Sequence, residues 1–181
     1  FKTELTNMDR HIQPLLETQR FQVVRIKHRC SDGVEHTRDM MQHPGAVTVI
    51  PMVDEQHVCL IRNFRIGVNQ TLVELPAGTL EAGEDPGQCA RRELVEETGF
   101  RAEKIIRLHS FYMSPGVMDE RMHLFAASDL EAGSAAREPG EFIENLVIPW
   151  SQAIEMIHDG EIQDAKTIVG LLYYDRILNM L

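Results

Sequence analysis

The amino-acid sequence predicts a domain of the α/β or α+β class. Strand-like apolar segments occur before and after one short, sharply bounded helix, and another helix is predicted near the C-terminus. The 181 residues, 43% of them hydrophobic and 25% charged, suffice for one domain with a sizeable core. We therefore expect a mixed sheet sandwiched between helices.

The N-terminal part is expected to form a small sheet. The only helical signal before the first strand covers residues 8–16, where Pro14 would interrupt it. Residues 21–28 alternate and contain β-branched side chains, and residues 34–41 follow a turn at Gly33. These two segments predict a β-hairpin.

The rest of the chain alternates apolar runs with breaks. The runs predict strands at residues 46–50, 58–62, 72–75, 105–113, 122–127 and 142–148. A stretch rich in Gly, Ala, Ser, Glu and Pro predicts a mobile loop at residues 129–140. Ser151 is the expected N-cap of a helix that ends before Gly160, and Asp164 is the expected N-cap of a last helix at about 165–178.

The best-defined helix lies in the middle of the chain. Asp85 is a favourable N-cap, Pro86 suits the first helical turn, and Gln88 stands at the third helical position of a capping box. Gly99 stands where helices end in a left-handed residue. These signals predict a helix over residues 86–98.

One face of this helix is acidic. Glu93, Glu96 and Glu97 stand at positions i, i+3 and i+4, so their carboxylates share a face and repel one another. Such a face is either a solvated acidic surface or a site for a divalent cation. Mg²⁺ prefers oxygen ligands and binds through carboxylates together with substrate phosphates. A rigid helix face beside a Gly-rich loop meets that need.

The spacing around this helix resembles a known signature. Its fixed positions are Gly78, Glu84, Arg92-Glu93-Leu94, Glu96-Glu97 and Gly99-Phe100. These positions are separated by five, seven, one and one intervening residues, in that order. This pattern resembles the complete Nudix box, and only Phe100 departs from the aliphatic residue usual at the last position. The resemblance implies the Nudix hydrolase family, which hydrolyses nucleoside diphosphates linked to another group and uses Mg²⁺ or Mn²⁺.

The resemblance also implies a fold and a division of the chain. It predicts an α/β/α sandwich with a mixed sheet, preceded here by a small N-terminal β-hairpin. We expect residues 1–45 to form the N-terminal segment and residues 46–181 the Nudix hydrolase domain. Relatives with such a hairpin form dimers that share it, so a homodimer is expected.

By resemblance, the box supplies a metal site. Glu93 and Glu97 are the implied metal ligands, and Glu96 completes the catalytic cluster. The backbone carbonyl of Ala77 often joins them in relatives that have the sequence Pro-Ala-Gly. Carboxylate and carbonyl oxygens are the ligands that Mg²⁺ prefers.

The resemblance gives roles to three arginines. Arg92 is expected to pair with a neighbouring carboxylate such as Glu84 and to hold the acidic face in place. Arg65 matches an Arg that contacts the diphosphate or nucleotide in relatives, and Arg38 is a weaker candidate for such a contact. Guanidinium groups suit bidentate binding of phosphate. The alternatives are a surface salt bridge for Arg92 and an exposed side chain for Arg38.

A loop in the second half of the chain indicates the substrate. Ser114 and Pro115 are followed by Gly, Pro115 lies sixteen residues after Gly99, and a Glu-Arg pair follows at residues 120–121. This arrangement resembles the ADP-ribose pyrophosphatase branch of the family, although relatives that cleave GDP-mannose share the Ser-Pro-Gly. The loop is therefore expected at the substrate, the alternative being a plain connection between strands.

A later loop is the expected source of the catalytic base. Glu141-Phe-Ile resembles the segment where ADP-ribose pyrophosphatases carry a catalytic or metal-binding Glu. Glu141 is either the base or a further metal ligand with Glu138 as the base, and both assignments stay open. The alternative is a charged surface loop. A mobile loop suits a base that must close on its substrate.

Composition limits the other classes of function. The net charge of −10 argues against nucleic-acid binding. Cys30, Cys59 and Cys89 show no metal-ligand spacing and are expected to be reduced. The sequence contains neither an apolar run long enough for a membrane span nor a signal-peptide pattern. We therefore expect a cytoplasmic protein whose partner is a small-molecule nucleotide sugar.

The resulting hypothesis is Mg²⁺-dependent hydrolysis of ADP-ribose to AMP and ribose 5-phosphate. Hydrolysis of another nucleoside diphosphate sugar, such as GDP-mannose, is the first alternative. A non-catalytic Nudix-fold sensor is the second alternative. Such modules commonly lose glutamates of the box, and all of them are present here.

Overall fold

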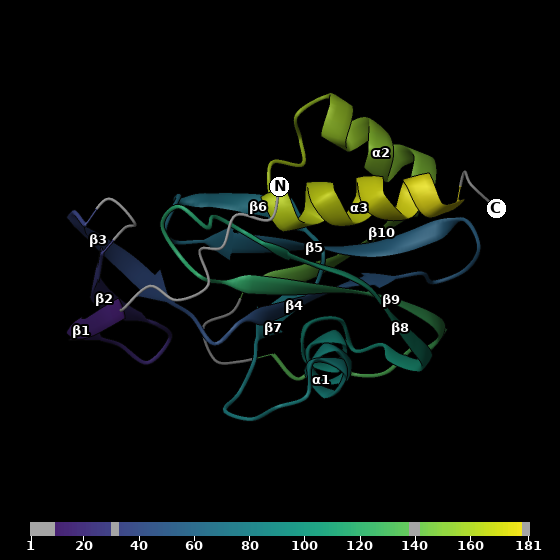
Figure 1. The fold of residues 1–181 in the computed structure, drawn as a ribbon. Coiled ribbons are helices and arrows are strands. Elements are labelled where there is room, and N and C mark those ends of the chain that lie inside the picture. The colour runs from purple at the N-terminus through teal and green to yellow at the C-terminus, as the bar shows by residue number, and fades with distance from the viewer. Residues whose placement is uncertain (1–9, 30–32, 138–141, 179–181) are drawn as a thin grey trace. The chain divides into compact units, whose positions relative to one another are not determined.

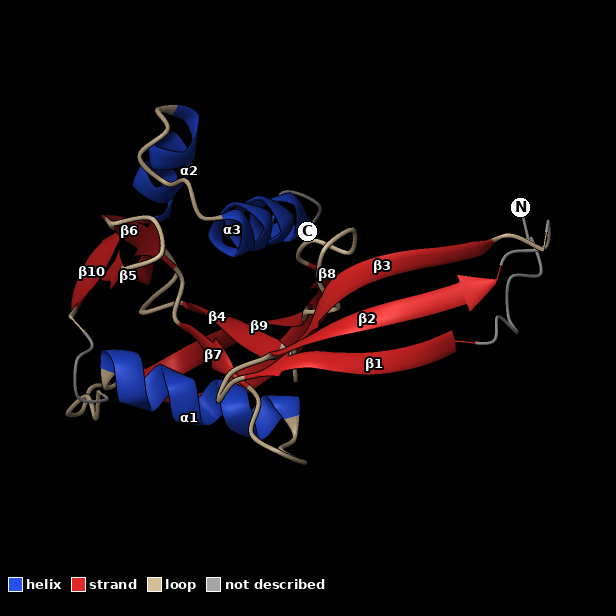
Figure 2. Ribbon diagram, turned by 90° about the vertical axis from the view of Figure 1, so that its left-hand side faces the viewer, coloured by secondary structure: helices blue, strands red, loops and turns tan. Residues whose placement is uncertain are grey.

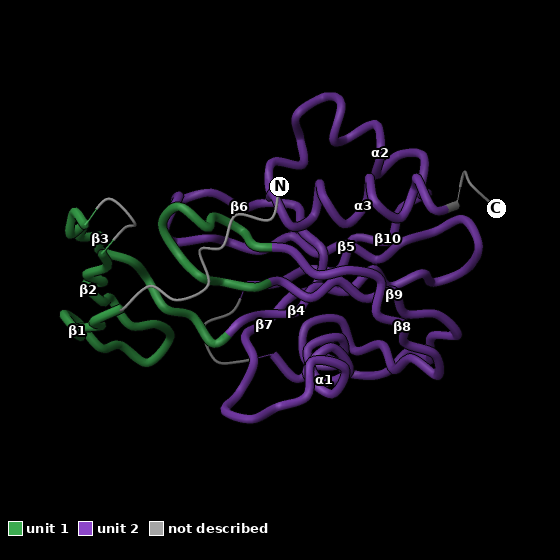
Figure 3. Tube along the Cα trace, in the orientation of Figure 1, with its two compact units in different colours: residues 1–44, 112–121 green, residues 45–111, 122–181 purple. Residues whose placement is uncertain are grey.

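The computed structural model describes residues 10–29, 33–137 and 142–178. The chain divides into two compact units, residues 1–44 with 112–121 and residues 45–111 with 122–181 (Figure 3). The first unit thus combines the N-terminal strands with a segment from the middle of the chain.

Within the residues of the first unit that the structure describes, three antiparallel strands form a sheet: β1 (Arg10–Glu17), β2 (Gln22–Arg29) and β3 (Glu35–Gln42), in the order β1-β2-β3. The predicted hairpin is confirmed as β2 and β3. The helical signal at residues 8–16 is wrong for the described residues, which form β1. Pro14 has no amide hydrogen for a helix but is tolerated on an edge strand, and the register shifts between Pro14 and Leu16.

The middle segment of the first unit is hydrogen-bonded to the end of β3. The Met41 N–H donates to the Val117 carbonyl at 2.9 Å, and the Asp119 N–H donates to the Met41 carbonyl at 3.1 Å. Asp119 Oδ1 accepts the backbone N–H of His43 at 2.8 Å. The loop with the Ser-Pro-Gly sequence therefore belongs to the first unit.

The described residues of the second unit form two sheets. A mixed sheet has the order β7-β4-β9-β8, with β4 and β9 parallel, and an antiparallel sheet has the order β10-β5-β6. The strands are β4 (Ala46–Pro51), β5 (His57–Arg65), β6 (Gln70–Glu74), β7 (Ala77–Thr79), β8 (Arg101–Tyr112), β9 (Arg121–Glu131) and β10 (Ile143–Pro149). The expected mixed sheet is present, and the antiparallel sheet accompanies it.

In the described part of the chain, three helices cover these strands: α1 (Pro86–Thr98), α2 (Trp150–His158) and α3 (Ala165–Leu178). Within the second unit, α1 lies on one side of the strands and α2 and α3 lie on the other (Figures 1 and 2). This arrangement confirms the expected α/β/α sandwich. None of the described helices is long and apolar enough to cross a membrane.

Apolar clusters fill the spaces between these layers, and β4 contributes to two of them. It is buried along its whole length, as expected of a strand that is covered on both faces. Val47 and Val49 belong to the cluster beneath α1, whereas Ile50 belongs to the cluster that contacts α2 and α3. The strand therefore links the helix with the acidic face to the opposite helical layer.

The C-terminal helices begin in different ways. Ser151 is not the N-cap of α2, because the helix starts one residue earlier, at Trp150, with Pro149 at the cap position and no side-chain cap. The end of β10 thus leads directly into α2. Asp164 does cap α3, as predicted: its carboxylate accepts the backbone N–H of Thr167 at 3.0 Å.

Candidate metal and catalytic site

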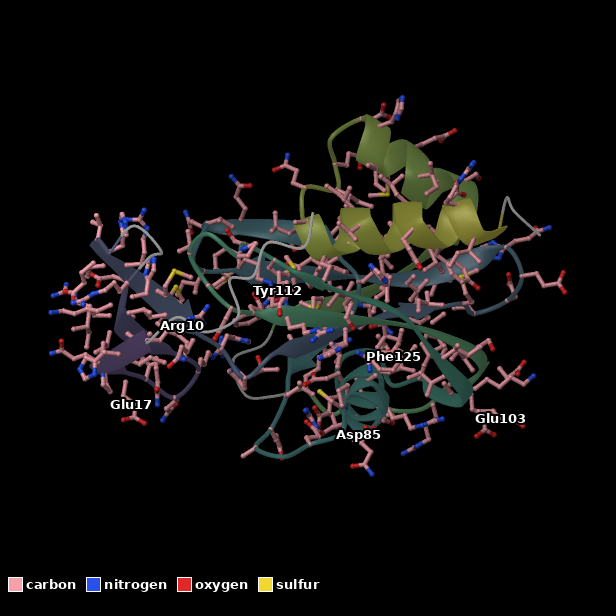
Figure 4. All side chains as sticks on the ribbon, viewed as in Figure 1. Arg10, Glu17, Asp85, Glu103, Tyr112 and Phe125 are labelled. Atoms are coloured by element: carbon pink, nitrogen blue, oxygen red, sulfur yellow. The ribbon has the colours of Figure 1, made fainter. Side chains whose placement is uncertain are left out.

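Local signals set both ends of α1. Asp85 is the N-cap of this helix: its Oδ1 accepts the backbone N–H groups of Gly87 at 2.9 Å and Gln88 at 3.2 Å, and Figure 4 labels Asp85 beside the helix. Gly99 ends the helix with a φ of 80°, and a Cβ there would lie 2.6 Å from the Gly133 carbonyl oxygen. The predicted bounds of this helix are confirmed.

The acidic face of α1 is largely withdrawn from water. Ala90 and Leu94 are fully buried, and the neighbouring Glu93 and Glu97 are only 9% and 4% exposed. The Glu96 side chain keeps 34% of its surface exposed. Burial of carboxylates is costly unless positive charge or hydrogen bonds compensate. The face is therefore not a plain solvated surface.

Arg92 supplies positive charge to these carboxylates. Its Nε and Nη2 donate to the two carboxylate oxygens of Glu84, each at 2.9 Å. Its Nη1 donates to Glu93 Oε1 at 2.6 Å and to Glu96 Oε2 at 3.0 Å. The predicted pairing with Glu84 is confirmed. The hydrogen bonds from Arg92 lower the pKa of Glu84 from 4.5 to about 2, and the same bonds raise the pKa of Arg92.

Strand β7 fits closely against this face. The Ala77 N–H donates to Glu97 Oε2 at 2.8 Å. A Cβ on Gly78 would lie 1.9 Å from the carboxyl carbon of Glu93, so a side chain at this position would displace that carboxylate. The fixed glycine of the box thus leaves room for a carboxylate. The predicted ligands Ala77, Glu93 and Glu97 are brought together.

We refer to the following residues as the α1 cluster: Glu84, Arg92, Glu93, Glu96 and Glu97. The cluster holds four carboxylates and one guanidinium group. No group of three or more His, Cys, Asp or Glu side chains within the described ranges is already arranged to hold a metal ion. Arg92 and the Ala77 N–H hold carboxylate oxygens instead. The donor chemistry nevertheless fits Mg²⁺ or Mn²⁺, because several carboxylates lie together with an excess of negative charge, and Ala77, whose carbonyl is a further candidate ligand, is hydrogen-bonded to one of them.

The loop between β9 and β10, which we call the late loop, is hydrogen-bonded to the end of α1. Glu138 and Glu141 lie outside the described residues. Just before them, the Ala136 N–H donates to the Glu96 carbonyl at 3.0 Å, and Arg137 Nε donates to the Glu97 carbonyl at 3.1 Å. Sequence reasoning gave Arg137 no role, because its partner lies forty residues away in the chain. The loop predicted as mobile is therefore held at this point.

Arg65 stands at the end of β5 and is engaged by a neighbouring strand. Its Nε and Nη2 donate to the two carboxylate oxygens of Glu74 at 2.7 and 2.6 Å. The Glu74 side chain is 1% exposed and the Arg65 side chain 40%. Glu74 was given no role from the sequence, although a charged residue inside an apolar strand is a signal for a buried pair. A phosphate contact by Arg65 stays a prediction.

The other predicted substrate residues belong to the first unit. Arg38 and Pro115 line one pocket of about 350 Å³, together with Arg10 and His28 and with apolar side chains of the sheet. Ser114 is exposed, and its carbonyl accepts a turn hydrogen bond at 2.9 Å. Their contact with substrate stays a prediction.

Two aromatic residues of the second unit have contacts that stabilise the fold. The His109 ring stacks on Tyr173 with 5.1 Å between the ring centroids. The Trp150 indole N–H donates to Asp175 at 2.9 Å, which joins α2 to α3.

Comparison with known proteins shows the family of the chain. A model of the NUDIX domain matches residues 42–169. The chain is 39% identical to "ADP-ribose pyrophosphatase" of Bacillus subtilis (strain 168) and 37% identical to "Methanol dehydrogenase activator" of Bacillus methanolicus, in each case over 78% of both chains. It is 36% identical to "GDP-mannose pyrophosphatase" of Shigella flexneri over 82% of both.

A solved structure shows the same fold. The crystal structure of an ADP compounds hydrolase matches with a TM-score of 0.84 at 23% identity, over 98% of this chain and 97% of that one. The fold and the buried box together define a Nudix domain. The chain belongs to the Nudix family and is a Nudix hydrolase.

Proposed function

We propose that this protein hydrolyses the diphosphate of ADP-ribose to AMP and ribose 5-phosphate with a divalent metal ion. The observation that carries the proposal is the α1 cluster, where buried carboxylates outnumber the one arginine. The choice of ADP-ribose is supported by the relative named ADP-ribose pyrophosphatase and by the loop with Ser114 and Pro115.

Glu93 and Glu97, with the Ala77 carbonyl, would hold Mg²⁺ or Mn²⁺, and Glu96 would complete the site. When bound, the metal would offset charge on the diphosphate oxygens and lower the pKa of a bound water. Arg92 orients Glu93 and Glu96 through its hydrogen bonds. Its role is to keep the carboxylates in place before the substrate arrives.

The catalytic base comes from the late loop. Glu141 takes this role, or it serves as a further metal ligand and Glu138 is the base. The anchoring of the preceding residues to Glu96 and Glu97 supports a base from this loop. Replacing each residue by Gln separates the assignments: loss of the base lowers kcat at saturating Mg²⁺, whereas loss of a ligand is partly offset by more Mg²⁺.

Arginine contacts are proposed for substrate binding. The residues proposed to contact the nucleotide sugar are those that the resemblance implies: Arg65, Arg38, Ser114 and Pro115. A pocket that contains Arg38 and Pro115 with apolar side chains suits a nucleotide, which has both anionic and flat apolar parts. Replacement of Arg38 or Arg65 by Lys should raise KM more than it lowers kcat.

We also propose a cytoplasmic homodimer that binds no nucleic acid and no membrane. The β1 strand exposes Ile12, Leu15 and Leu16, at 46%, 43% and 55% of their surfaces, which supports coverage by a second copy. The net charge of −10 disfavours nucleic acid. Light scattering should give twice the chain mass, and a monomer mass would count against the dimer.

A substrate panel tests the proposed activity. The protein is incubated with Mg²⁺ and ADP-ribose, GDP-mannose, ADP-glucose or NADH, and the released nucleoside monophosphate is measured. Preference for ADP-ribose is expected. GDP-mannose is the second candidate, because relatives named GDP-mannose pyrophosphatase match at 36% identity. Absence of turnover with both Mg²⁺ and Mn²⁺ would contradict the proposal and favour a nucleotide sensor.

A further inference from the structure

The backbone between β6 and β7 leads directly to the α1 cluster. Leu75 is fully buried, and its N–H donates to the side-chain Oγ1 of Thr167 in α3 at 2.8 Å. Two residues later, the Ala77 N–H donates to Glu97 Oε2. One side chain of α3 thus holds the segment that meets a predicted metal ligand.

The Pro76 carbonyl between them is held as well. It accepts the backbone N–H of Val49 at 2.9 Å and the hydroxyl of Thr48 at 3.3 Å. Pro76 has no N–H of its own. The Leu75 N–H, the Pro76 carbonyl and the Ala77 N–H therefore have partners in α3, β4 and α1, respectively, and these bonds restrain the path of the segment.

The direction of each hydrogen bond made by the Thr167 hydroxyl is fixed. Its single hydrogen goes to Asp164 Oδ2 at 2.6 Å, so a lone pair of Oγ1 faces the Leu75 N–H. Thr167 is fully buried, and its own backbone N–H also donates to Asp164. The cap of α3 therefore fixes the orientation of the hydroxyl that holds Leu75.

A balanced group of charges fixes the same end of α3. Lys166 Nζ lies 2.5 Å from Glu74 Oε2 and 3.0 Å from Asp164 Oδ2. Glu74 also receives the bidentate pair from Arg65. Glu74 is fully buried and Lys166 is 7% exposed. We refer to the following residues as the α3 cluster: Arg65, Glu74, Asp164 and Lys166.

We propose that Thr167 and Lys166 are positioning residues for the metal site on α1. They hold the start of α3 against Leu75, and thereby hold Ala77 at the place where its N–H meets Glu97 and where its carbonyl can serve as a metal ligand. The inference rests on the metal chemistry of the proposed function. It concerns groups that do not contact the metal or the substrate but determine where the ligands stand.

The test is Mn²⁺ binding, followed by the electron paramagnetic resonance signal of free Mn²⁺ in the absence of substrate. Thr167→Val keeps the β-branched shape and removes the hydroxyl, and Thr167→Ser keeps the hydroxyl. Loss of a residue that orients metal ligands typically costs about 10–100-fold in affinity. We expect Thr167→Val to weaken Mn²⁺ binding by about 10-fold and Thr167→Ser to bind as the wild type does.

A second variant and a control separate positioning from stability. Lys166→Gln keeps a hydrogen-bond donor without charge and should also weaken Mn²⁺ binding, so the inference remains testable if Thr167→Val does not fold. Trp150→Phe removes the hydrogen bond to Asp175 and should lower the unfolding midpoint without changing Mn²⁺ affinity. Lowered stability with unchanged Mn²⁺ affinity in Thr167→Val, or in Lys166→Gln if Thr167→Val does not fold, would overturn the inference.

The outcome is separate from that of the substrate panel. If the wild type binds Mn²⁺ but hydrolyses none of the nucleotide sugars, the proposed activity fails and the variants still decide the positioning role. If the wild type turns over substrate and Thr167→Val binds Mn²⁺ equally well, only the positioning role fails. A wild type that binds no Mn²⁺ overturns both the inference and the metal chemistry.

Discussion

Two groups of charged side chains in the second unit differ in the balance between their positive and negative charges. The α1 cluster holds four carboxylates and one guanidinium, whereas the α3 cluster holds two carboxylates and two cations. Both are partly or fully buried, and in both an arginine binds a glutamate through two hydrogen bonds.

The difference shows what each cluster can do. Buried charges of one sign are costly without compensation, so a group with excess carboxylates is suited to receive a cation. In a group with equal numbers of positive and negative charges, each charge already has a partner of opposite sign. Such a group contributes by fixing the positions of the strands and helices to which its side chains belong. In Glu74, burial raises the pKa, but hydrogen bonding and charge from Arg65 and Lys166 outweigh it and the pKa stays below its usual value.

The largest expected effect is a loss of turnover when one of the excess carboxylates of the α1 cluster is neutralised. Glu97→Gln keeps the shape of the side chain and removes a proposed metal ligand, so kcat should fall by about 10³-fold or more. The unfolding midpoint should change little, because like-charge repulsion is relieved as well. Glu155→Gln on α2 is the matched control and should keep full activity. Turnover near that of the wild type in Glu97→Gln would remove the metal assignment.

Displacing a carboxylate without changing its charge should have the next largest effect. Gly78→Ala places a Cβ 1.9 Å from the Glu93 carboxyl carbon, so the carboxylate must move. We expect kcat/KM to fall by about 10²-fold, with partial recovery at high Mg²⁺. Gly67→Ala is the control, because a Cβ there meets nothing within 4 Å. Equal activity of the two variants would show that the fit at Gly78 is unimportant.

Removing one charge from the α3 cluster is expected to lower the stability of the protein. Lys166→Met leaves Glu74 with Arg65 alone and should lower the free energy of unfolding by about 2 kcal/mol, less than the ~3–5 kcal/mol typical of an isolated buried pair. The double change Glu74→Leu with Lys166→Met should cost less than the sum of the single changes. Denaturant unfolding measures both, and strict additivity would show that the two side chains are not coupled.

The smallest expected effect is the pH dependence from Glu84. Its folded-state pKa of about 2 lies below its ordinary 4.5, so its contribution to stability is complete above about pH 4.5 and is lost as the pH falls through about 2. Arg92 is 28% exposed, so solvent screening reduces the contribution to about 1 kcal/mol. The difference in unfolding free energy between wild type and Glu84→Gln should therefore shrink on going from pH 6 to pH 2. A constant difference would contradict the pairing with Arg92.

The helix with the acidic face could be predicted because its signals are local. Asp85, Pro86 and Gly99 act within one turn of the backbone they terminate, and the spacing of the glutamates follows from the helical period. Two errors arose where neighbouring strands decide the outcome. Residues 10–17 pair with β2, and β10 leads into α2 ahead of Ser151.

The partners of the buried charges could not be predicted from spacing. Lys166 and Glu74 are 92 residues apart, and the sequence around each residue does not indicate that the other is its partner. Arg137 likewise binds a carbonyl of α1 from forty residues away. The sequence pattern identified which carboxylates belong together on α1, but only the fold shows which distant elements hold Ala77 and Glu97 in place.

The most direct test of the account is calorimetric titration with Mg²⁺ of the wild type and of the double variant Glu93→Gln, Glu97→Gln. We expect that the wild type binds Mg²⁺ and that the double variant folds normally but does not bind Mg²⁺. Equal Mg²⁺ binding by the two proteins would contradict the claim that the excess carboxylates of the α1 cluster form the metal site.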